Sequence, residues 1–148
     1  MSETTPAFSI QRSYIFGLGK WLQSLALSGR ESRERTKFIE TLNTELQEID
    51  LVRMEIIKKY AEIDPDTKEP MMKEEDGSSH YVVPDEKMAD FSDEFKKYLE
   101  EDFTMTIDGN IQRLKIVKSI VLDTPEKIDS SVAEAYDKWC DAFEKVEV

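Results

Sequence analysis

The residues that come closest to a metal site lie in the acidic stretch that begins at Asp64. A calcium-binding loop starting there would have Asp66 at its third position and Glu75 at its twelfth, as an EF-hand requires. The fifth position, however, is Lys68, a cation where a ligand oxygen is needed, and the sixth is Glu69, where the turn requires glycine. We therefore expect an ordinary acidic turn here and no bound metal ion.

The candidate nucleophiles and bases also lack partners. His80 is the only histidine, and no cysteine or second histidine lies at zinc-ligand spacing from it. Ser78 and Ser79 are too close to it in a strand to form a hydrolase triad, and a catalytic Cys140 would need His80 as its base. The sequence GLGK at residues 17–20 lacks the spacing of a phosphate loop. The sequence predicts neither an enzyme nor a cofactor.

The formal net charge of −12 is concentrated in one part of the chain. Residues 62–102 contain fifteen acidic and five basic side chains, whereas residues 1–61 contain eight acidic and nine basic ones. An acidic surface repels nucleic acids, because their binding depends on Lys and Arg. We expect no direct nucleic-acid binding. The acids indicate one of two things: a partner protein with a basic surface, such as a nucleic-acid-binding site that they occupy as a mimic of nucleic acid, or only a well-solvated surface.

Cysteine usage and hydropathy predict a cytoplasmic protein. Cys140 is the only cysteine, so no internal disulfide is available, as is typical of a reducing compartment. The longest apolar stretch, SYIFGLGKWLQSLAL, is short and is interrupted by Lys20 and Gln23. We expect neither a membrane span nor a secretion signal.

The elements that would position these residues are mainly helical. Apolar residues recur at intervals of three and four and predict five helices. The first spans residues 10–27, where Gly17 and Gly19 could either break it or let another helix approach closely, and the second spans residues 30–63. The third begins near Asp85, the fourth spans residues 111–121, and the fifth is capped by Thr124 with Pro125 at its first position. The predicted fold class is mainly α: a single domain over residues 1–148, built as a long helical hairpin or bundle of about five helices with a coiled-coil-like arm and a small β-hairpin or three-stranded β-tip.

Residues 64–86 are expected to form an acidic turn and β-hairpin between two long helices. Strand-forming residues flank the turn dipeptide Asp76-Gly77, and the alternation of Phe103, Met105 and Ile107 predicts a third strand laid against this hairpin. The candidate protein-contact residues of the tip are Met71, Met72, Glu74, Glu75, Asp76, His80 and Tyr81. The tip is therefore either a recognition surface or only a connector.

A basic cluster opposes the acidic trend. Arg30, Arg33 and Lys37 are spaced by three and four and share one face of the expected second helix. This face is either a docking patch for phosphate or for an acidic surface, such as the tip of another copy, or a solvated face with Glu31 and Glu34 as partners within the helix.

The sequence LSGRESRERTKFIETLNTELQEIDLVRMEIIKKYAEID, followed by a hairpin and the segment FSDEFKKYLEEDFTM, resembles a family of small helical bacteriophage proteins of unknown function from phages of Gram-positive bacteria. The resemblance covers residues 18–140 and implies a helical fold and a phage context but no activity. With the charge distribution, it predicts a non-enzymatic, phage-encoded protein that binds and modulates or inhibits a host factor or defence protein in the host cytoplasm. The alternative is a structural or assembly component of a virion or tail that acts through helical self-association into a homo-oligomer.

Overall fold

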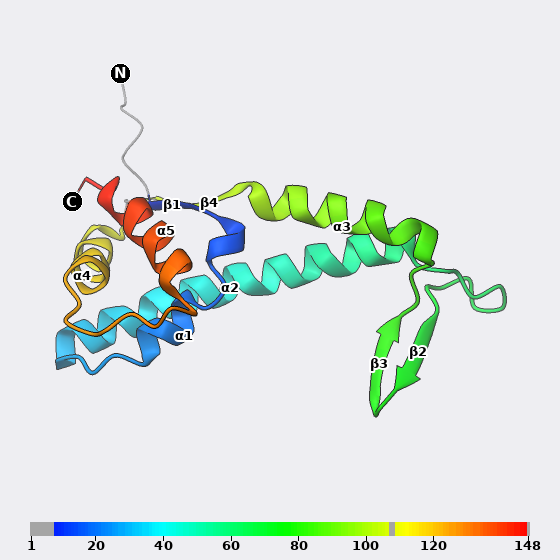
Figure 1. Ribbon diagram of the computed structural model, residues 1–148, viewed down its shortest axis with the longest axis horizontal. Coiled ribbons are helices and arrows are strands. Elements are labelled where there is room, and N and C mark those ends of the chain that lie inside the picture. Colours follow the sequence, from blue (N-terminus) through cyan, green and yellow to red (C-terminus); the bar gives the residue numbers. More distant parts are fainter. Residues whose placement is uncertain (1–7, 107–108, 148) are drawn as a thin grey trace, which may run out of the picture. The chain divides into compact units, whose positions relative to one another are not determined.

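The computed structural model describes residues 8–106 and 109–147, and these residues are mainly helical (Figure 1). The helices are α1 (Leu18–Gln23), α2 (Gly29–Tyr60), α3 (Asp85–Glu100), α4 (Ile111–Leu122) and α5 (Ala133–Glu144). The strands are β1 (Phe8–Gln11), β2 (Met72–Glu75), β3 (Ser78–Tyr81) and β4 (Asp102–Met105), and a 3-10 turn spans Arg12–Tyr14. The predicted class, mainly α with about five helices and a small β-hairpin, is confirmed. A coiled-coil arrangement stays a prediction.

The chain forms two compact units. Unit 1 comprises the described parts of residues 1–46 and 100–148, and unit 2 comprises residues 47–99. Helix α2 contributes its first part to unit 1 and its second part to unit 2. Unit 1 contains α1, α4, α5 and the sheet formed by β1 and β4, whereas unit 2 contains most of α3 and the β2–β3 hairpin.

The core of unit 1 is aromatic and joins distant parts of the sequence. The ring of Phe8 stacks on that of Phe143, with centroids 4.4 Å apart, and meets the ring of Phe38 edge-on at 5.8 Å. The indole N–H of the fully buried Trp139 donates to the backbone carbonyl of Tyr14 over 2.6 Å. Strand β1, the start of α2 and α5 therefore share one core, since large aromatic side chains dominate such packing.

The helix predicted over residues 10–27 forms only in part, and the break that Gly17 or Gly19 could cause occurs at Gly17. The segment begins as strand β1, continues through the 3-10 turn and becomes helical only at α1. Gly17 precedes α1 with a φ of 85°, a left-handed conformation that favours glycine and lies outside helical geometry. Gly19 lies inside α1, where a Cβ atom would be 3.7 Å from Ile39 of α2, so this glycine sits against the longer helix.

The predicted third strand exists, but its predicted partner is wrong. Strand β4 pairs antiparallel with β1, and β2 pairs only with β3, so the described strands form two separate two-stranded sheets (Figure 1). In the β1–β4 register Phe8 lies opposite Met105, and both side chains are buried. Strand β4 needs a partner beside which its apolar side chains can be buried. Strand β1 provides this in unit 1, whereas β2 and β3 of the hairpin contain no buried residue. Ile107, expected in this strand, lies outside the described residues.

The predicted start of the last helix is also wrong, because α5 begins at Ala133 rather than at Pro125. The Thr124 hydroxyl does accept a backbone N–H, that of Glu126, over 3.2 Å, and the Asp129 carboxylate accepts that of Ser131 over 3.1 Å. Such local bonds between side chain and backbone compete with helix formation. They close turns in the segment that precedes α5.

The importance of β1 to the core can be tested with Phe8→Ala. Removing a fully buried phenylalanine side chain is expected to lower the free energy of unfolding of unit 1 by about 3–5 kcal/mol. Both tryptophans, Trp21 and Trp139, belong to unit 1, so tryptophan fluorescence during urea unfolding reports on this unit. Phe16→Ala is the matched control, since Phe16 is 46% exposed. Equal losses for the two variants would contradict the assignment of Phe8 to the core.

Candidate protein-binding surface

The β2–β3 hairpin has the geometry that its sequence predicts (Figure 1). Its two-residue turn consists of Asp76, with a φ of 50°, and Gly77, with a φ of 79°. Two successive left-handed residues match the right-handed twist of the flanking strands, and Asp-Gly is a favoured pair for this turn. The turn fixes the register, which places Met72 opposite Tyr81 and Glu75 opposite Ser78.

A closed cycle of backbone hydrogen bonds forms the base of the hairpin. The N–H of Glu62 donates to the carbonyl of Val82 over 2.8 Å, and the N–H of Val82 donates to Met71 over 3.0 Å. The N–H of Met71 completes the cycle by donating to the carbonyl of Glu62 over 2.7 Å. Because Glu62 follows α2 by two residues, the cycle attaches both strands of the hairpin to the end of that helix.

The loop between α2 and the hairpin is closed by local bonds. The Asp64 carboxylate accepts the backbone N–H of Asp66 over 2.8 Å and that of Thr67 over 3.3 Å. Its backbone N–H donates to the carbonyl of Glu69 over 2.9 Å. Asp64 therefore closes a turn of the kind that aspartate commonly forms. Within the described residues, no group of three or more His, Cys, Asp or Glu side chains is placed to hold a metal ion.

The register divides the hairpin into two faces. Directly opposed residues of paired strands share a face, and successive residues alternate between faces. Met72 and Tyr81 therefore lie on one face, together with Pro70 and the residue paired with it, Ile63. We call these four residues the hairpin face. Met71, although next in sequence to Met72, lies on the opposite face.

The predicted contact residues of the tip are therefore only partly brought together. Glu74 lies on the same side as Met72, two residues along β2, and extends the hairpin face with a carboxylate. Glu75 and His80 lie on the opposite side, where His80 is paired in register with Lys73. The Lys73 ammonium also lies 3.2 Å from the Glu75 carboxylate, both largely exposed. Asp76 is in the turn, between the two faces.

Unpartnered apolar surface is concentrated in unit 2. Among the described residues the exposed large apolar side chains are Phe16, Leu51, Ile63, Met72, Met88 and Ile111. Four of these six belong to residues 47–99, and two, Ile63 and Met72, are on the hairpin face with 52% of each residue exposed. The same 53-residue unit carries fifteen acidic and eight basic side chains. Exposed apolar groups within a charged surface are typical of interaction sites.

Helix α3 is held to α2 by a shared carboxylate. Glu94 accepts from the Lys59 ammonium over 2.9 Å and from the Tyr60 hydroxyl over 2.7 Å. The hydrogen bonds from Lys59 and then Tyr60 lower the pKa of the Glu94 carboxyl below its usual value. The bond to Glu94 is the main cause that raises the pKa of both Lys59 and Tyr60. Each shift favours the protonation state that the group has near neutral pH.

The basic cluster belongs to unit 1 and not to the unit that contains the hairpin. Arg30, Arg33 and Lys37 are exposed on α2, and Arg30 lines a shallow pocket of about 320 Å³ together with Lys115 of α4. The predicted role of Glu34 as a partner within the helix is wrong, because its carboxylate pairs with Arg113 of α4 over 3.1 Å. Glu31 accepts from the Ser28 hydroxyl over 2.8 Å.

Arg35, the fourth basic residue of this stretch, has a structural role. Its guanidinium donates to the backbone carbonyls of Leu22, over 2.9 Å, and Leu25. These carbonyls lie at and just after the end of α1, where the last turn leaves acceptors unsatisfied. Basic side chains commonly bind such carbonyls, but the sequence alone does not indicate which of the four cations does so.

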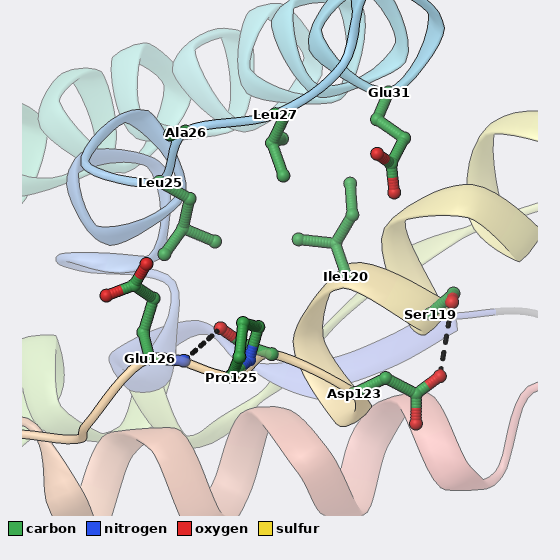
Figure 2. Close-up of a pocket in the computed structure, with 10 residues that line it drawn as sticks. Leu25, Ala26, Leu27, Glu31, Ser119, Ile120, Asp123, Pro125 and Glu126 are labelled. Atoms are coloured by element: carbon green, nitrogen blue, oxygen red, sulfur yellow. Dashed lines mark hydrogen bonds between the residues drawn. The ribbon is translucent and has the colours of Figure 1, made fainter.

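A second pocket, of about 240 Å³, lies between the segment after α1 and the end of α4 (Figure 2). Leu25 and Ile120 point into it and form an apolar floor. Glu31, Asp123 and Glu126 are at its edge, and Figure 2 shows their carboxylates on different sides rather than directed at one point. The Asp123 carboxylate accepts from the Ser119 hydroxyl over 3.2 Å. The pocket is small for a ligand site and does not hold a convergent set of polar groups.

Cys140 lies on α5 in unit 1 and is half-buried. Burial raises the pKa of its thiol, and a thiol with a raised pKa is a weak nucleophile. Burial also raises the pKa of the neighbouring Tyr136 to about 12, and the hydroxyl of Tyr136 donates to the carbonyl of Val121 over 2.7 Å. Both groups lie against the aromatic core of unit 1 and contribute to its packing.

Comparisons with known proteins found no matching family model, no matching curated protein and no matching solved structure. The resemblance to small phage proteins and the location in a host cytoplasm therefore stay predictions. Among the described residues, no helix has both the length and the apolar character needed to cross a membrane.

The shared carboxylate leads to a testable pH dependence. Since the pKa of Glu94 is lowered in the folded state, its contribution to the α2–α3 contact is complete above the ordinary value of 4.5 and is lost as the pH falls through the lowered value. Tyr60→Phe removes one donor and is expected to raise the pKa of Glu94, measured by carbon-13 NMR of the side-chain carboxyl. Tyr81→Phe in the hairpin is the control. An unchanged Glu94 titration in Tyr60→Phe would contradict this arrangement.

Proposed function

We propose that this chain is a non-enzymatic, acidic interaction protein that binds a protein partner with a basic surface. The observation that carries the proposal is the hairpin face, where Ile63 and Met72 expose apolar surface beside the carboxylate of Glu74. The cycle of backbone bonds at its base and the two-residue turn at its end hold this face in a defined geometry. A preformed surface loses less conformational entropy on binding than a flexible segment does.

The two kinds of side chain would have different roles in binding. Met72 and Tyr81 would supply the apolar contact area that gives most of the affinity, since a few large side chains usually dominate an interface. The surrounding acids would accelerate association with a basic surface and disfavour acidic ones. The one permanent cation of the strands, Lys73, lies on the side opposite Met72 and is paired there with Glu75.

The charge distribution favours a basic protein surface over a nucleic acid as the partner. Binding to phosphates requires Lys and Arg that displace counterions, and the hairpin strands β2 and β3 contain only Lys73 as a permanent cation. The exposed basic residues Arg30, Arg33 and Lys37 belong to unit 1. We therefore assign recognition to the hairpin of unit 2 rather than to the basic cluster.

The proposal predicts that changes of charge at the tip weaken partner capture. Glu74→Lys, Glu75→Lys and Asp76→Asn in one variant should lower recovery of the partner from lysate of the source organism by about tenfold at moderate salt, through loss of attraction. Asparagine is chosen at position 76 because it tolerates the left-handed conformation. The measurement is quantitative mass spectrometry of proteins captured by the tagged chain.

Two matched controls separate the hairpin face from general effects of charge or hydrophobicity. Glu134→Lys, Asp137→Lys and Glu144→Gln make the same change of charge at exposed positions of α5. Met72→Gln should weaken capture, whereas Ile111→Gln should not, although both residues are 52% exposed. Equal capture by all variants would refute the hairpin face as the contact. Recovery of only the chain itself, with association that rises with concentration, would favour self-assembly instead.

A further inference from the structure

Strand β1 of unit 1 has one edge that no described strand covers, since it pairs only with β4. Just after β1, the N–H of Arg12 donates to the carbonyl of Glu101 over 3.0 Å, which makes these two residues a hydrogen-bonded pair of the antiparallel ladder. Opposed residues of such a ladder alternate between hydrogen-bonded and non-hydrogen-bonded pairs. Ile10 is therefore bonded to β4, whereas the N–H groups of Ser9 and Gln11 and the carbonyl of Ser9 point away from β4.

These three backbone groups have no hydrogen-bond partner in the described part of the chain. No residue of 8–106 or 109–147 donates to them or accepts from them. A strand edge with unpaired N–H and C=O groups is a template for another strand, and proline is one common way to block it. Strand β1 contains no proline. Its edge therefore presents two donors and one acceptor to a chain that lies beside it.

A groove of about 500 Å³ runs along this edge, between β1 and α5. Three consecutive residues of β1 line it, Ser9, Ile10 and Gln11, but only one residue of β4, Asp102. Side chains of consecutive strand residues point to opposite faces of a sheet, so a pocket that includes all three lies beside the strand rather than on one face. Its volume is in the range of ligand-binding clefts.

Both walls of the groove are held in place by contacts of the core. Phe8 of β1 stacks on Phe143 of α5, and the indole N–H of Trp139 on α5 donates to the carbonyl of Tyr14. The ring of Tyr14 and the ammonium of Lys138, 5.9 Å from the ring centre, belong to residues that line the groove. The groove is therefore preformed, which lowers the entropic cost of binding.

The lining selects a polypeptide backbone rather than a charged ligand. Two lysines of the lining, Lys138 and Lys145, are offset by two aspartates, Asp102 and Asp141. Equal numbers of cations and acids give no strong attraction for a ligand of either sign. The unpaired groups of β1, in contrast, have the spacing of a strand ladder, which an extended chain repeats. Addition of an extended peptide to an exposed sheet edge is a common mode of recognition.

We infer that the groove between β1 and α5 binds an extended segment of a partner protein, which adds to the sheet as a third strand beside β1. The segment donates to the carbonyl of Ser9 and accepts from the N–H groups of Ser9 and Gln11. This site belongs to unit 1, and the inference does not depend on the hairpin face of unit 2.

Amide hydrogen exchange in the full chain tests the uncovered edge. Relative to their intrinsic rates, the amides of Ser9 and Gln11 should exchange at least about tenfold faster than that of Ile10, which is bonded to β4. Equal protection of all three amides would overturn the inference, because the edge would then already be covered. Protection of Ser9 and Gln11 that rises with protein concentration would also overturn it, because the occupant would then be a second copy.

The probe for binding is a capped peptide of about seven alternating threonines and valines, about 23 Å long as a strand. N-methyl groups on its valines block one edge and stop the peptide from building sheets of its own, and we call it the edge peptide. The control peptide is N-methylated on the threonines as well. Saturating edge peptide should slow exchange at Ser9 and Gln11 at least about fivefold relative to the control peptide. Equal effects of the two peptides, or slower exchange at Thr104 of β4 instead, would overturn the inference.

Substitutions at Gln11 locate the site. The φ of Gln11 is −57°, which proline also adopts, so Gln11→Pro removes an unpaired N–H and leaves the bonds to β4 in place. Binding of the edge peptide, followed at the amide of Ser9, should weaken about fivefold through the lost hydrogen bond. Gln11→Ala loses the same side-chain bond to Ser13 but keeps the N–H, and it should bind like the wild type. Equal affinities of the two variants, with unchanged tryptophan fluorescence, would overturn the assignment to β1.

Discussion

Both units depend on the apolar residues that recur along one face of α2. The same helix buries Phe38, Ile39 and Leu42 in unit 1 and Ile49, Ile56 and Ile57 in unit 2. Because a helix repeats its faces every 3.6 residues, a residue inserted or deleted within α2 would rotate all later side chains by about 100°. The spacing along this one helix therefore sets which residues can be buried in each unit. A proline within it would disrupt the positioning of both cores at once.

The two units are stabilised in different ways. Unit 1 closes its core with segments from both ends of the sequence, such as Phe8 and Phe143, and ties them with the bond from Trp139 to Tyr14. Unit 2 is formed by consecutive residues, and its described contacts include the carboxylate of Glu94 and the backbone cycle at Glu62. Elements with few buried apolar contacts open at a lower free-energy cost. The hairpin face thus lies in the unit with the smaller apolar core.

Features set by neighbouring residues could be predicted from the sequence. The apolar residues that recur at intervals of three and four predicted both ends of α2 to within three residues. The dipeptide Asp76-Gly77 identified the hairpin turn. Strand β1 was missed, since it is only four residues long and Ile10 also fits the helical spacing with Tyr14 and Leu18. The partner of β4 could not be chosen, because alternation identifies a strand but not the strand that lies beside it.

The candidate surface was predicted only as a region. Which tip residues act together depends on register, and a shift of one residue would exchange Met71 for Met72 on the hairpin face. The apolar stripe of α3 was identified from its spacing, but a stripe looks the same in a sequence whether a neighbour covers it or not. The hydrogen bonds from Lys59 and Tyr60 to Glu94 show which side of α3 faces α2.

The backbone cycle at Glu62, Met71 and Val82 uses no side-chain atom. Any residue except proline can donate and accept in the same way, so the attachment of the hairpin places little restriction on the residues beyond it. Residues 72–81 can therefore change by mutation, or be replaced by another hairpin of the same register, while their junction with α2 is kept. Such a junction lets the specificity of a recognition surface diverge rapidly among descendants of one fold, and it makes the same position suitable for grafting a foreign hairpin.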